Sequence, residues 1–263
     1  MNTEAEAALN QELQVHRRLA RPGTFVDIGA HTGDFSLALA DLPGLDLVAV
    51  EPLPLPLARL RARAAAARLA VRTLAVALSD RPGHMRLNAP VLAGGPVWSW
   101  ASIAKDFAGL RTRHPEIVGI EGMDVPVTTL DALGLAGVRA IKLDAEGAEY
   151  EILRGGRELL RTQRPVVSVE LEERHREGCT HAVPAFMDAL EYECVFVAHG
   201  RVFPLAAFDR ATMQRGSPSP ASHVYSDPYV NCFFFVPRED TEARRRLYGA
   251  ARIGACRPVR RPS

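Results

Sequence analysis

Short apolar runs alternate with longer amphipathic stretches along most of the chain, which is the pattern of an α/β protein built on a parallel sheet. In the first unit, residues 25–28 form an apolar run, Gly29 interrupts it, and an apolar helical pattern begins near Gly33. These features predict a strand, a tight turn and a helix. Strands are predicted at 25–28, 45–50, 71–77, 138–143, 166–169 and 193–198, with a last strand at 230–236 that inserts antiparallel. Helices are predicted at 2–19, 33–41, 57–69, 183–190 and 240–247, with two helical pieces between 146 and 162.

Two stretches lack a regular period. Residues 88–123 contain Trp98 and Trp100 among prolines and glycines, with a helix predicted at 104–113. A long irregular insert in a compact domain is either functional or disordered, and two tryptophans favour order. They form a wall for an apolar or sugar-like substrate, or they pin the loop to the core. The second stretch, 200–221, is predicted to be a variable loop.

The predicted domain organisation follows from these boundaries. It comprises an N-terminal helix or cap at 1–22, a single domain at 23–240, and a C-terminal helix with a basic tail at 241–263. Within the domain, 88–124 and 200–222 are predicted substrate-side loops. The N-terminal helix is expected to pack on the sheet edge, with a lid over the ligand as the alternative.

The glycine spacing restricts the ligand. It is G-x-x-x-G, with Asp27 two residues before Gly29, and His31 stands where the dinucleotide fingerprint has its second glycine. That glycine admits a pyrophosphate. Asp27 would disfavour a phosphate and favour a cation such as an amino acid ammonium. An adenosine that carries an amino acid fits both features, and that ligand is S-adenosylmethionine.

Acidic residues follow four of the predicted strands. Glu51 ends the second strand, about 18 residues after Gly33, where an acid is placed to bind a ribose diol. Asp27, Asp144 and Glu170 end three others. Because ligands bind at the carboxyl ends of strands in open parallel sheets, we predict that these four acids meet at one rim. Asp80, after the third predicted strand, is a candidate for the adenine amino group or a turn aspartate.

Composition narrows the class of protein. The chain has 263 residues and a formal net charge of +1, so no basic face for nucleic acid is expected. No apolar run approaches the roughly 20 residues of a membrane span, and no leader opens the chain. Four scattered cysteines favour reduced thiols and a cytoplasmic location, without a zinc site.

The chain resembles the FkbM-type methyltransferases, a branch of the class I S-adenosylmethionine-dependent fold. The matching pieces are FVDIGAHTGDFSL, VAVEPLP, ALSD, VPVTTLD, IKLDAEGAEYEILRGG, RPVVSVELE and VNCFFFVP, which span residues 25–237. The resemblance implies a Rossmann-like α/β fold with helices on both faces of a seven-stranded sheet, in the order 3-2-1-4-5-7-6 with strand 7 antiparallel. It also implies O-methylation of a hydroxyl, often on a sugar or polyketide-type secondary metabolite.

The resemblance also implies site residues. Asp27, Gly29, Gly33 and Glu51 correspond to cofactor contacts, and Ser79 and Asp80 to positions near adenine. Asp144 and Glu146 occupy signature positions. The predicted cofactor site further includes Ala30, His31 and Pro52, which adjoin these residues, and Asp144; the His31 side chain is assigned no role, since the family commonly has a residue such as Asn there.

Two mechanisms remain open from the residues. In the first, Asp144 accepts the proton of the acceptor hydroxyl or orients it, with Glu170 and His175 as further candidates for the base. In the second, Asp144, Glu170 and His199 hold a divalent cation such as Mg²⁺ or Ca²⁺, which acidifies a sugar diol.

Other classes of protein would show features that this sequence lacks. An NAD-dependent oxidoreductase predicts a G-x-G-x-x-G turn, and a nucleic-acid methyltransferase predicts a basic groove or an N-P-P-[YF] motif. A scaffold that has lost its chemistry would not need acids at four strand ends. The expected partner is a small molecule that bears a hydroxyl; the sequence does not name it, and it leaves a homodimer open.

Overall fold

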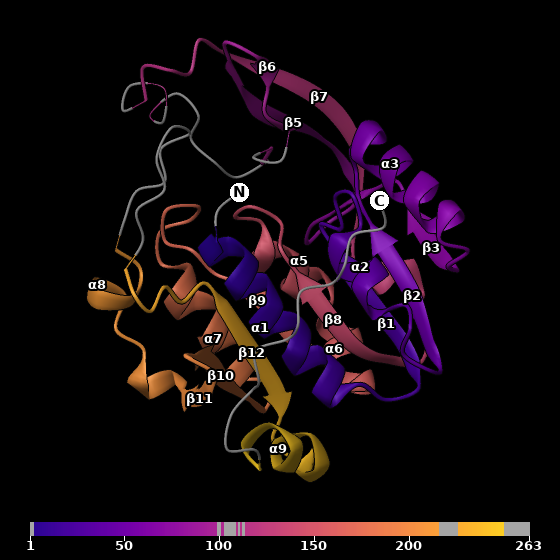
Figure 1. The fold of residues 1–263 in the computed structure, drawn as a ribbon, viewed down its shortest axis with the longest axis vertical. Coiled ribbons are helices and arrows are strands. Elements are labelled where there is room, and N and C mark those ends of the chain that lie inside the picture. The colour runs from indigo at the N-terminus through magenta and orange to yellow at the C-terminus, as the bar shows by residue number, and fades with distance from the viewer. Residues whose placement is uncertain are drawn as a thin grey trace.

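The main sheet explains why the predicted strand ends meet. The computed structural model describes residues 3–98, 101–102, 109, 111, 114–215 and 226–249. The sheet has the order β11-β10-β12-β9-β8-β1-β2-β3 (Figure 1). Its strands are β1 (Gly23–Ile28), β2 (Leu45–Val50), β3 (Val71–Leu74), β8 (Val138–Leu143), β9 (Val166–Glu170), β10 (Tyr192–Ala198), β11 (Arg201–Pro204) and β12 (Cys232–Pro237).

The strand order confirms the predicted fold class. Read as strands 3-2-1-4-5-7-6, the order β3-β2-β1-β8-β9-β12-β10 is the one that the family resemblance implies. The strand β12 lies antiparallel between β9 and β10, as predicted. The prediction of seven strands was short by one, because β11 pairs antiparallel with β10 at the edge, within the segment that was predicted as a variable loop.

Helices cover both faces of this sheet. On one face lie α1 (Thr3–Leu19), α2 (Asp34–Leu39), α3 (Pro54–Ala66) and α9 (Thr241–Tyr248); on the other lie α5 (Glu149–Gly155), α6 (Arg157–Gln163) and α7 (Cys179–Asp188). The largest cluster of buried apolar side chains lies between the sheet and α5, α6 and α7. The described residues also contain the short helix α8 (Arg210–Met213) and 3-10 turns at Asp131–Leu133 and Leu205–Ala207.

The N-terminal helix belongs to the core. His16 on α1 is buried, with its Nε2 2.7 Å from Oγ of Ser168 on β9 and its ring edge-to-face with Phe25 on β1. Burial, aided by the charge of Lys142, lowers the pKa of His16 to about 3, so the imidazole is neutral. The prediction of a cap at the sheet edge was therefore wrong in position, since α1 crosses the middle of one face (Figure 1).

A second sheet lies beyond the carboxyl ends of the main strands. It contains β4 (Ala77–Leu78), β5 (Gly83–Leu92), β6 (Gly95–Pro96) and β7 (Gly119–Thr128), in the order β4-β7-β5-β6. The expectation of an irregular stretch at 88–123 was wrong at both ends of that range, because β5 and β7 pair antiparallel there. Likewise, the predicted strand 71–77 divides into β3 and β4, which belong to different sheets. The predicted helix at 104–113 falls largely outside the described residues.

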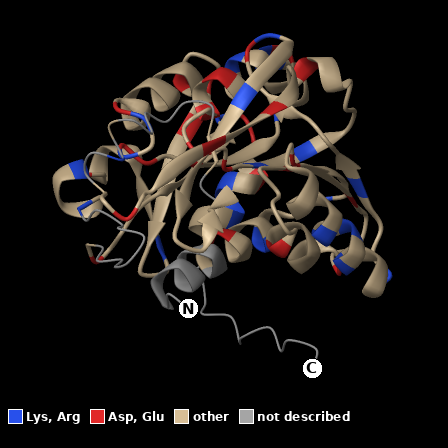
Figure 2. Cartoon of the chain, turned by 90° about the horizontal axis from the view of Figure 1, so that it is seen from above, with Lys and Arg blue, Asp and Glu red and all other residues tan. Residues whose placement is uncertain are grey.

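Basic and acidic residues are spread over both helices and strands (Figure 2). Arg59, Arg61 and Arg63 on α3 are exposed and form a solvated face of this helix. Within the part of the chain that the structure describes, no helix is both long enough and apolar enough to cross a bilayer.

Candidate active site

A cavity of about 290 Å³ opens at the carboxyl ends of β1, β2 and β8. The strands end at its floor, and the second sheet supplies part of its wall. Its lining residues are Ile28, Gly29, His31, Val50, Glu51, Pro52, Leu53, Val76, Ala77, Leu78, Leu87, Trp98, Ala101, Asp144, Ala145, Glu146, Ala148 and Ile152. The volume is close to the lower end of the range found for small-molecule sites.

The structure brings some of the predicted site residues into this cavity and leaves others outside. Gly29, His31, Glu51, Pro52 and Asp144 line it. The predicted residues that do not line it are Asp27, Ala30, Gly33, Ser79, Asp80, Glu170, His175 and His199. Trp98 lines the cavity and also packs on the core of the second sheet with Leu53 and Leu87, so it does pin the loop to the core, while its contact with a substrate stays a prediction.

Gly29 is required by the approach of two strand ends. Its φ is 76°, in the left-handed region that favours glycine, and a Cβ at this position would lie 1.8 Å from the backbone oxygen of Asp144. The tight turn predicted from the sequence is confirmed by this φ, and the predicted contact with a ligand stays a prediction. The structure adds a further reason: β1 and β8 could not end side by side with a side chain here.

Glu51 is held in place by the same turn. Its Oε2 accepts a hydrogen bond from the backbone N–H of His31 at 2.8 Å, and its Oε1 accepts one from Leu53 at 2.9 Å. Burial raises the pKa of this carboxyl group, and the two backbone donors partly offset the shift. Each oxygen keeps a second lone pair, so the carboxylate has acceptor capacity left for a diol.

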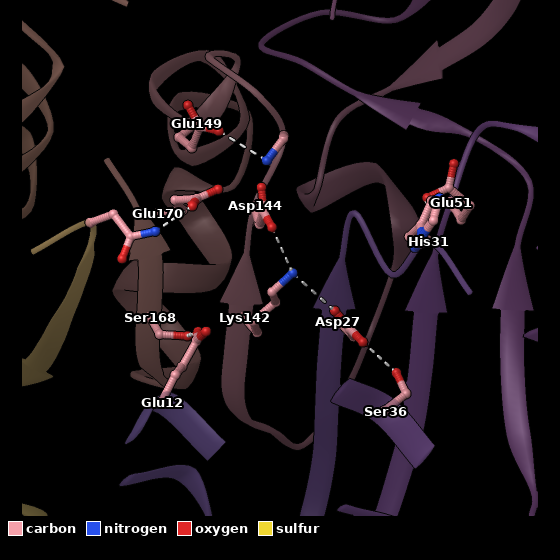
Figure 3. Close-up of polar contacts among 12 residues, drawn as sticks. Glu12, Asp27, His31, Ser36, Glu51, Lys142, Asp144, Glu149, Ser168 and Glu170 are labelled. Carbon is pink, nitrogen blue, oxygen red and sulfur yellow. Dashed lines mark hydrogen bonds and ion pairs between the residues drawn. The ribbon is translucent and has the colours of Figure 1, made fainter. Parts of the chain in front are cut away.

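Asp27 faces the protein interior. It is fully buried, and its Oδ2 accepts a hydrogen bond from Oγ of Ser36 at 2.5 Å (Figure 3). Burial raises its pKa, and the ammonium of Lys142, 3.8 Å from Oδ1, opposes that rise. The predicted contact of Asp27 with an amino acid ammonium is thus replaced, in this structure, by a contact with a lysine of the protein.

Lys142 is the functional candidate that the sequence reasoning missed. It is nearly buried on β8, and its Nζ lies 3.3 Å from Oδ2 of Asp144 as well as 3.8 Å from Asp27 (Figure 3). Burial alone would lower the pKa of Lys142, but Asp144, Asp27, Glu12 and Glu170 outweigh that effect and raise it. A lone lysine between Ile141 and Leu143 in a buried parallel strand was the available signal, since such a lysine needs an acidic partner.

Asp144 and Glu170 are close neighbours at the ends of β8 and β9. Burial, together with the charge of Asp144, raises the pKa of Glu170 well above its usual range. Asn231 donates a hydrogen bond from Nδ2 to Oε1 of Glu170 at 2.6 Å. Of this pair, Asp144 faces the cavity and Glu170 lies behind it.

A second group of polar side chains continues from Glu170. Ligand atoms of Glu170, Glu172 and His175 lie within 4.8 Å of one another, a spacing that would suit a metal ion. Glu172, however, is already bound by two donors, the guanidinium of Arg174 and the hydroxyl of Tyr229. Nε2 of His175 lies 3.3 Å from Oε2 of Glu146, which lines the cavity.

Two predicted residues lie apart from these acids. His199, proposed as a metal ligand, is exposed and places its Nε2 3.3 Å from Oδ1 of Asp227. Asp80, proposed to contact adenine, has its Oδ2 3.5 Å from Arg154. The neighbouring Ser79 is buried, and its backbone oxygen packs against Gly155.

Glu149 holds the loop that carries Asp144 and Glu146. Its Oε1 accepts hydrogen bonds from the backbone N–H groups of Ala145 at 2.9 Å and Gly147 at 3.1 Å. Glu149 is buried, so it does not pair with charges on the helix surface. Burial raises the pKa of this carboxyl group from 4.5 to about 7.

We expect Glu149→Gln to flatten the pH dependence of stability between pH 4.5 and 7. In that window the folded protein keeps a proton on Glu149 that the unfolded chain releases, so stability falls as pH rises. The difference of pKa corresponds to roughly 3 kcal/mol at most. The amide oxygen of the variant can accept both backbone hydrogen bonds without a charge. Urea unfolding at pH 5 and pH 8 measures the effect, and equal pH slopes in the two proteins would contradict it.

The sheet order, the antiparallel strand β12 and the cavity at the ends of β1, β2 and β8 define a class I methyltransferase fold. The comparison with solved structures agrees. The crystal structure of methyltransferase FkbM from Methylobacillus flagellatus matches with a TM-score of 0.50 and 16% identity. The match covers 82% of this chain and 45% of that one, so the chain spans somewhat less than half the length of that relative.

Residues 27–198 match the Methyltransferase FkbM domain. The chain therefore belongs to the FkbM methyltransferase domain family, which confirms the resemblance seen in the sequence and implies S-adenosylmethionine as the methyl donor. Gly29, Glu51, Asp144 and Glu170 lie within the matched residues, whereas α1 and β12 lie outside them.

Two further solved structures are more distant. Precorrin-6y C5,15-methyltransferase from Geobacter metallireducens has a TM-score of 0.43 and 12% identity, and covers 86% of each chain. The tRNA (uracil-54, C5)-methyltransferase of Pyrococcus abyssi, in complex with S-adenosylhomocysteine, has a TM-score of 0.41 and 10% identity over 87% of this chain and 38% of that one. No curated protein matches the sequence.

Proposed function

We propose that this protein transfers the methyl group of S-adenosylmethionine to a hydroxyl of a small molecule, of the sugar or polyketide-type secondary metabolite class. The observation that carries the proposal is the position of Asp144, whose carboxylate lines the cavity beside a second acid, Glu170. A hydroxyl is a poor nucleophile until a base accepts its proton, and a carboxylate at this place can do so.

The residues at the strand ends fit the methyl donor. Glu51 offers free lone pairs to the ribose hydroxyls, and the apolar side chains of Leu78, Leu87 and Trp98 offer a surface to the adenine ring. The ribose binds Glu51 at the end of β2. From there the amino acid end of the donor crosses the end of β1 and reaches Asp144 at the end of β8. When bound, the donor supplies an electrophilic methyl group on a sulfonium.

The protein's own residues then position the acceptor and hold its proton. Asp144 orients the acceptor hydroxyl toward the methyl group of the donor and accepts the proton of that hydroxyl. Glu170 neighbours this carboxyl group, and Glu146, whose carboxylate lies 3.3 Å from Nε2 of His175, forms the adjoining wall. Holding the hydroxyl in line with the methyl group supplies much of the acceleration that such a site can give.

Glu51→Gln is expected to weaken the binding of S-adenosylhomocysteine by about 10- to 100-fold. The amide of the variant would turn an N–H toward the backbone N–H of His31 or Leu53, and it would lose the charge that strengthens hydrogen bonds to the diol. Isothermal titration calorimetry measures the affinity. Glu121→Gln, the same change at an exposed position on β7, is the control and should bind as the wild type does. Equal affinities in both variants would remove Glu51 from the donor site.

The acceptor is sought in a small-molecule extract of cells that express the protein, incubated with the donor carrying a tritiated methyl group. We expect label in an organic product and, by mass spectrometry, a metabolite that has gained one CH₂. The contrary result is a protein that binds S-adenosylhomocysteine but gives no labelled product with extracts of several strains that express it. That result would favour a scaffold over an enzyme.

A metal-assisted reaction on a sugar diol is the second candidate, favoured by the spacing of Glu170, Glu172 and His175. The contacts of Glu172 with Arg174 and Tyr229 weigh against it, because a cation would have to displace a guanidinium. Transfer that survives dialysis against EDTA would exclude this version.

The remaining assignments extend the proposal. Residues 23–240 act as one methyltransferase domain, with the insert at 88–124 on the substrate side, as the place of Trp98 in the cavity wall supports. The segment 200–222 has the same proposed role, although none of its described residues lines the cavity. A small molecule is the partner, the enzyme acts in the cytoplasm, and a homodimer is compatible with the proposal.

A further inference from the structure

We propose that Lys142 is a positioning residue for methyl transfer, which acts by fixing the carboxylate of Asp144 at the floor of the cavity. The proposal rests on the proposed function, in which Asp144 accepts the proton of the acceptor.

The first support is the place of Lys142 in the sheet. It lies on β8, two residues before Asp144, and alternation along a strand turns its side chain toward the α1 and α2 face. Asp27, in register with Lys142 on the neighbouring strand β1, has a side chain on the same face. The ammonium therefore bridges two carboxylates from adjacent strand ends, at 3.3 Å from Asp144 and 3.8 Å from Asp27.

The second support is that both oxygens of Asp27 have a partner, which fixes its side chain. Ser36 on α2 donates to one oxygen of Asp27, while the other oxygen faces Lys142 (Figure 3). The carboxylate of Asp27 is thereby fixed and attracts the ammonium of Lys142. The ammonium, held in this way, can in turn position the carboxylate of Asp144. Side chains that are locked by packing and hydrogen bonds position a reacting group better than mobile ones.

The third support comes from α1, which lies outside the matched family residues. Glu12 accepts a hydrogen bond from Oγ of Ser168 at 2.6 Å, and Ser168 is in register with Lys142 on the adjacent strand β9. Glu12 acts electrostatically on Lys142 together with Asp27, Asp144 and Glu170, although burial raises the pKa of Glu12. Acids from α1, β1, β8 and β9 thus surround this lysine.

This arrangement gives Lys142 a role that differs from that of a base. It does not line the cavity, so it does not touch the acceptor or the methyl donor. Without its ammonium, the Asp144 side chain would lose its ionic contact at 3.3 Å and would be held toward the acceptor hydroxyl less firmly. Binding of the donor, which depends on Glu51 and the turn at Gly29, would change little.

A double-mutant cycle with Asp144→Asn tests this role. The probe is the extract fraction that the wild type labels from the tritiated donor, at fixed amount. Lys142→Met is expected to slow labelling by about 30- to 100-fold, with the affinity for S-adenosylhomocysteine within about threefold of the wild type. Lys142→Arg keeps a cation at this place and should recover at least a third of the rate. If Lys142 acts through Asp144, the double variant is no slower than Asp144→Asn alone, within about threefold.

Lys142→Met leaves the buried carboxylate of Asp27 and the partly exposed carboxylate of Asp144 without their cation and could prevent folding. In that case the cycle is run in the Asp27→Asn/Lys142→Met background, which removes both members of one buried pair. Losses that multiply in the double variant, or labelling by folded Lys142→Met within twofold of the wild type, overturn the proposal. An active Asp144→Asn variant would instead contradict the assignment of Asp144 on which the proposed function depends.

Discussion

Asp144→Asn is expected to slow methyl transfer by about 100- to 1,000-fold, the lower part of the roughly 10²- to 10⁴-fold range over which a positioned general base accelerates a reaction. An amide has the size of the carboxyl group but does not accept a proton from a hydroxyl. The substitution also loses the charge that attracts Lys142, so the side chain would be held less firmly. Labelling of the acceptor fraction from the tritiated donor measures the effect.

The affinity for S-adenosylhomocysteine should stay within about threefold in this variant, because Glu51 and the turn at Gly29 are unchanged. Asp124→Asn is the matched control: it makes the same change on β7, at an exposed aspartate whose Oδ1 lies 3.4 Å from Arg86. It should label the acceptor at the wild-type rate. Unchanged turnover in Asp144→Asn would remove this residue from the chemistry.

Gly29→Ala is expected to abolish donor binding and to destabilise the fold by at least about 3 kcal/mol. A non-glycine residue at φ 76° costs roughly 1–2 kcal/mol. The added Cβ would also meet the backbone oxygen of Asp144 at 1.8 Å, so the ends of β1 and β8 would have to separate. Thermal unfolding and calorimetry with S-adenosylhomocysteine measure the two effects.

The control variant, Gly134→Ala, separates the effect of the steric clash from the effect of the backbone strain. Gly134 also has a positive φ, 61°, and a Cβ there would meet nothing within 4 Å. Gly134→Ala should therefore cost only the conformational part, about 1 kcal/mol, and leave binding intact. Similar losses in the two variants would show that the contact between the strand ends is unimportant.

The main sheet could be predicted from the sequence because its strands are buried on both faces. β2 and β8 match their predicted bounds to the residue, since each is an apolar run that ends in an acid. The second sheet as a whole was not predicted, although the sequence favoured a short hairpin near His84–Leu87 and a short strand at the start of Val125–Leu133. β5 contains His84, Arg86 and Asn88, and its exposed positions leave little of the apolar pattern by which a strand is recognised.

The candidate site was predictable where it depends on strand ends and not where it depends on tertiary contacts. Glu51 and Asp144 follow buried strands, so topology alone brings them together at the cavity. Lys142 and Glu149 were assigned no part in the site. Their partners, Asp27 on another strand and the backbone of a folded-back loop, become neighbours only in the folded chain.

The central claim is that the methyl donor lies across the ends of β1, β2 and β8, with its sulfur toward Asp144. A crystal structure of the protein with S-adenosylhomocysteine tests it most directly. We expect the ribose hydroxyls on the carboxylate of Glu51 and the sulfur beside Asp144, with Lys142 between Asp144 and Asp27. A ligand bound away from the turn at Gly29, or one whose sulfur points away from Asp144, would contradict this account.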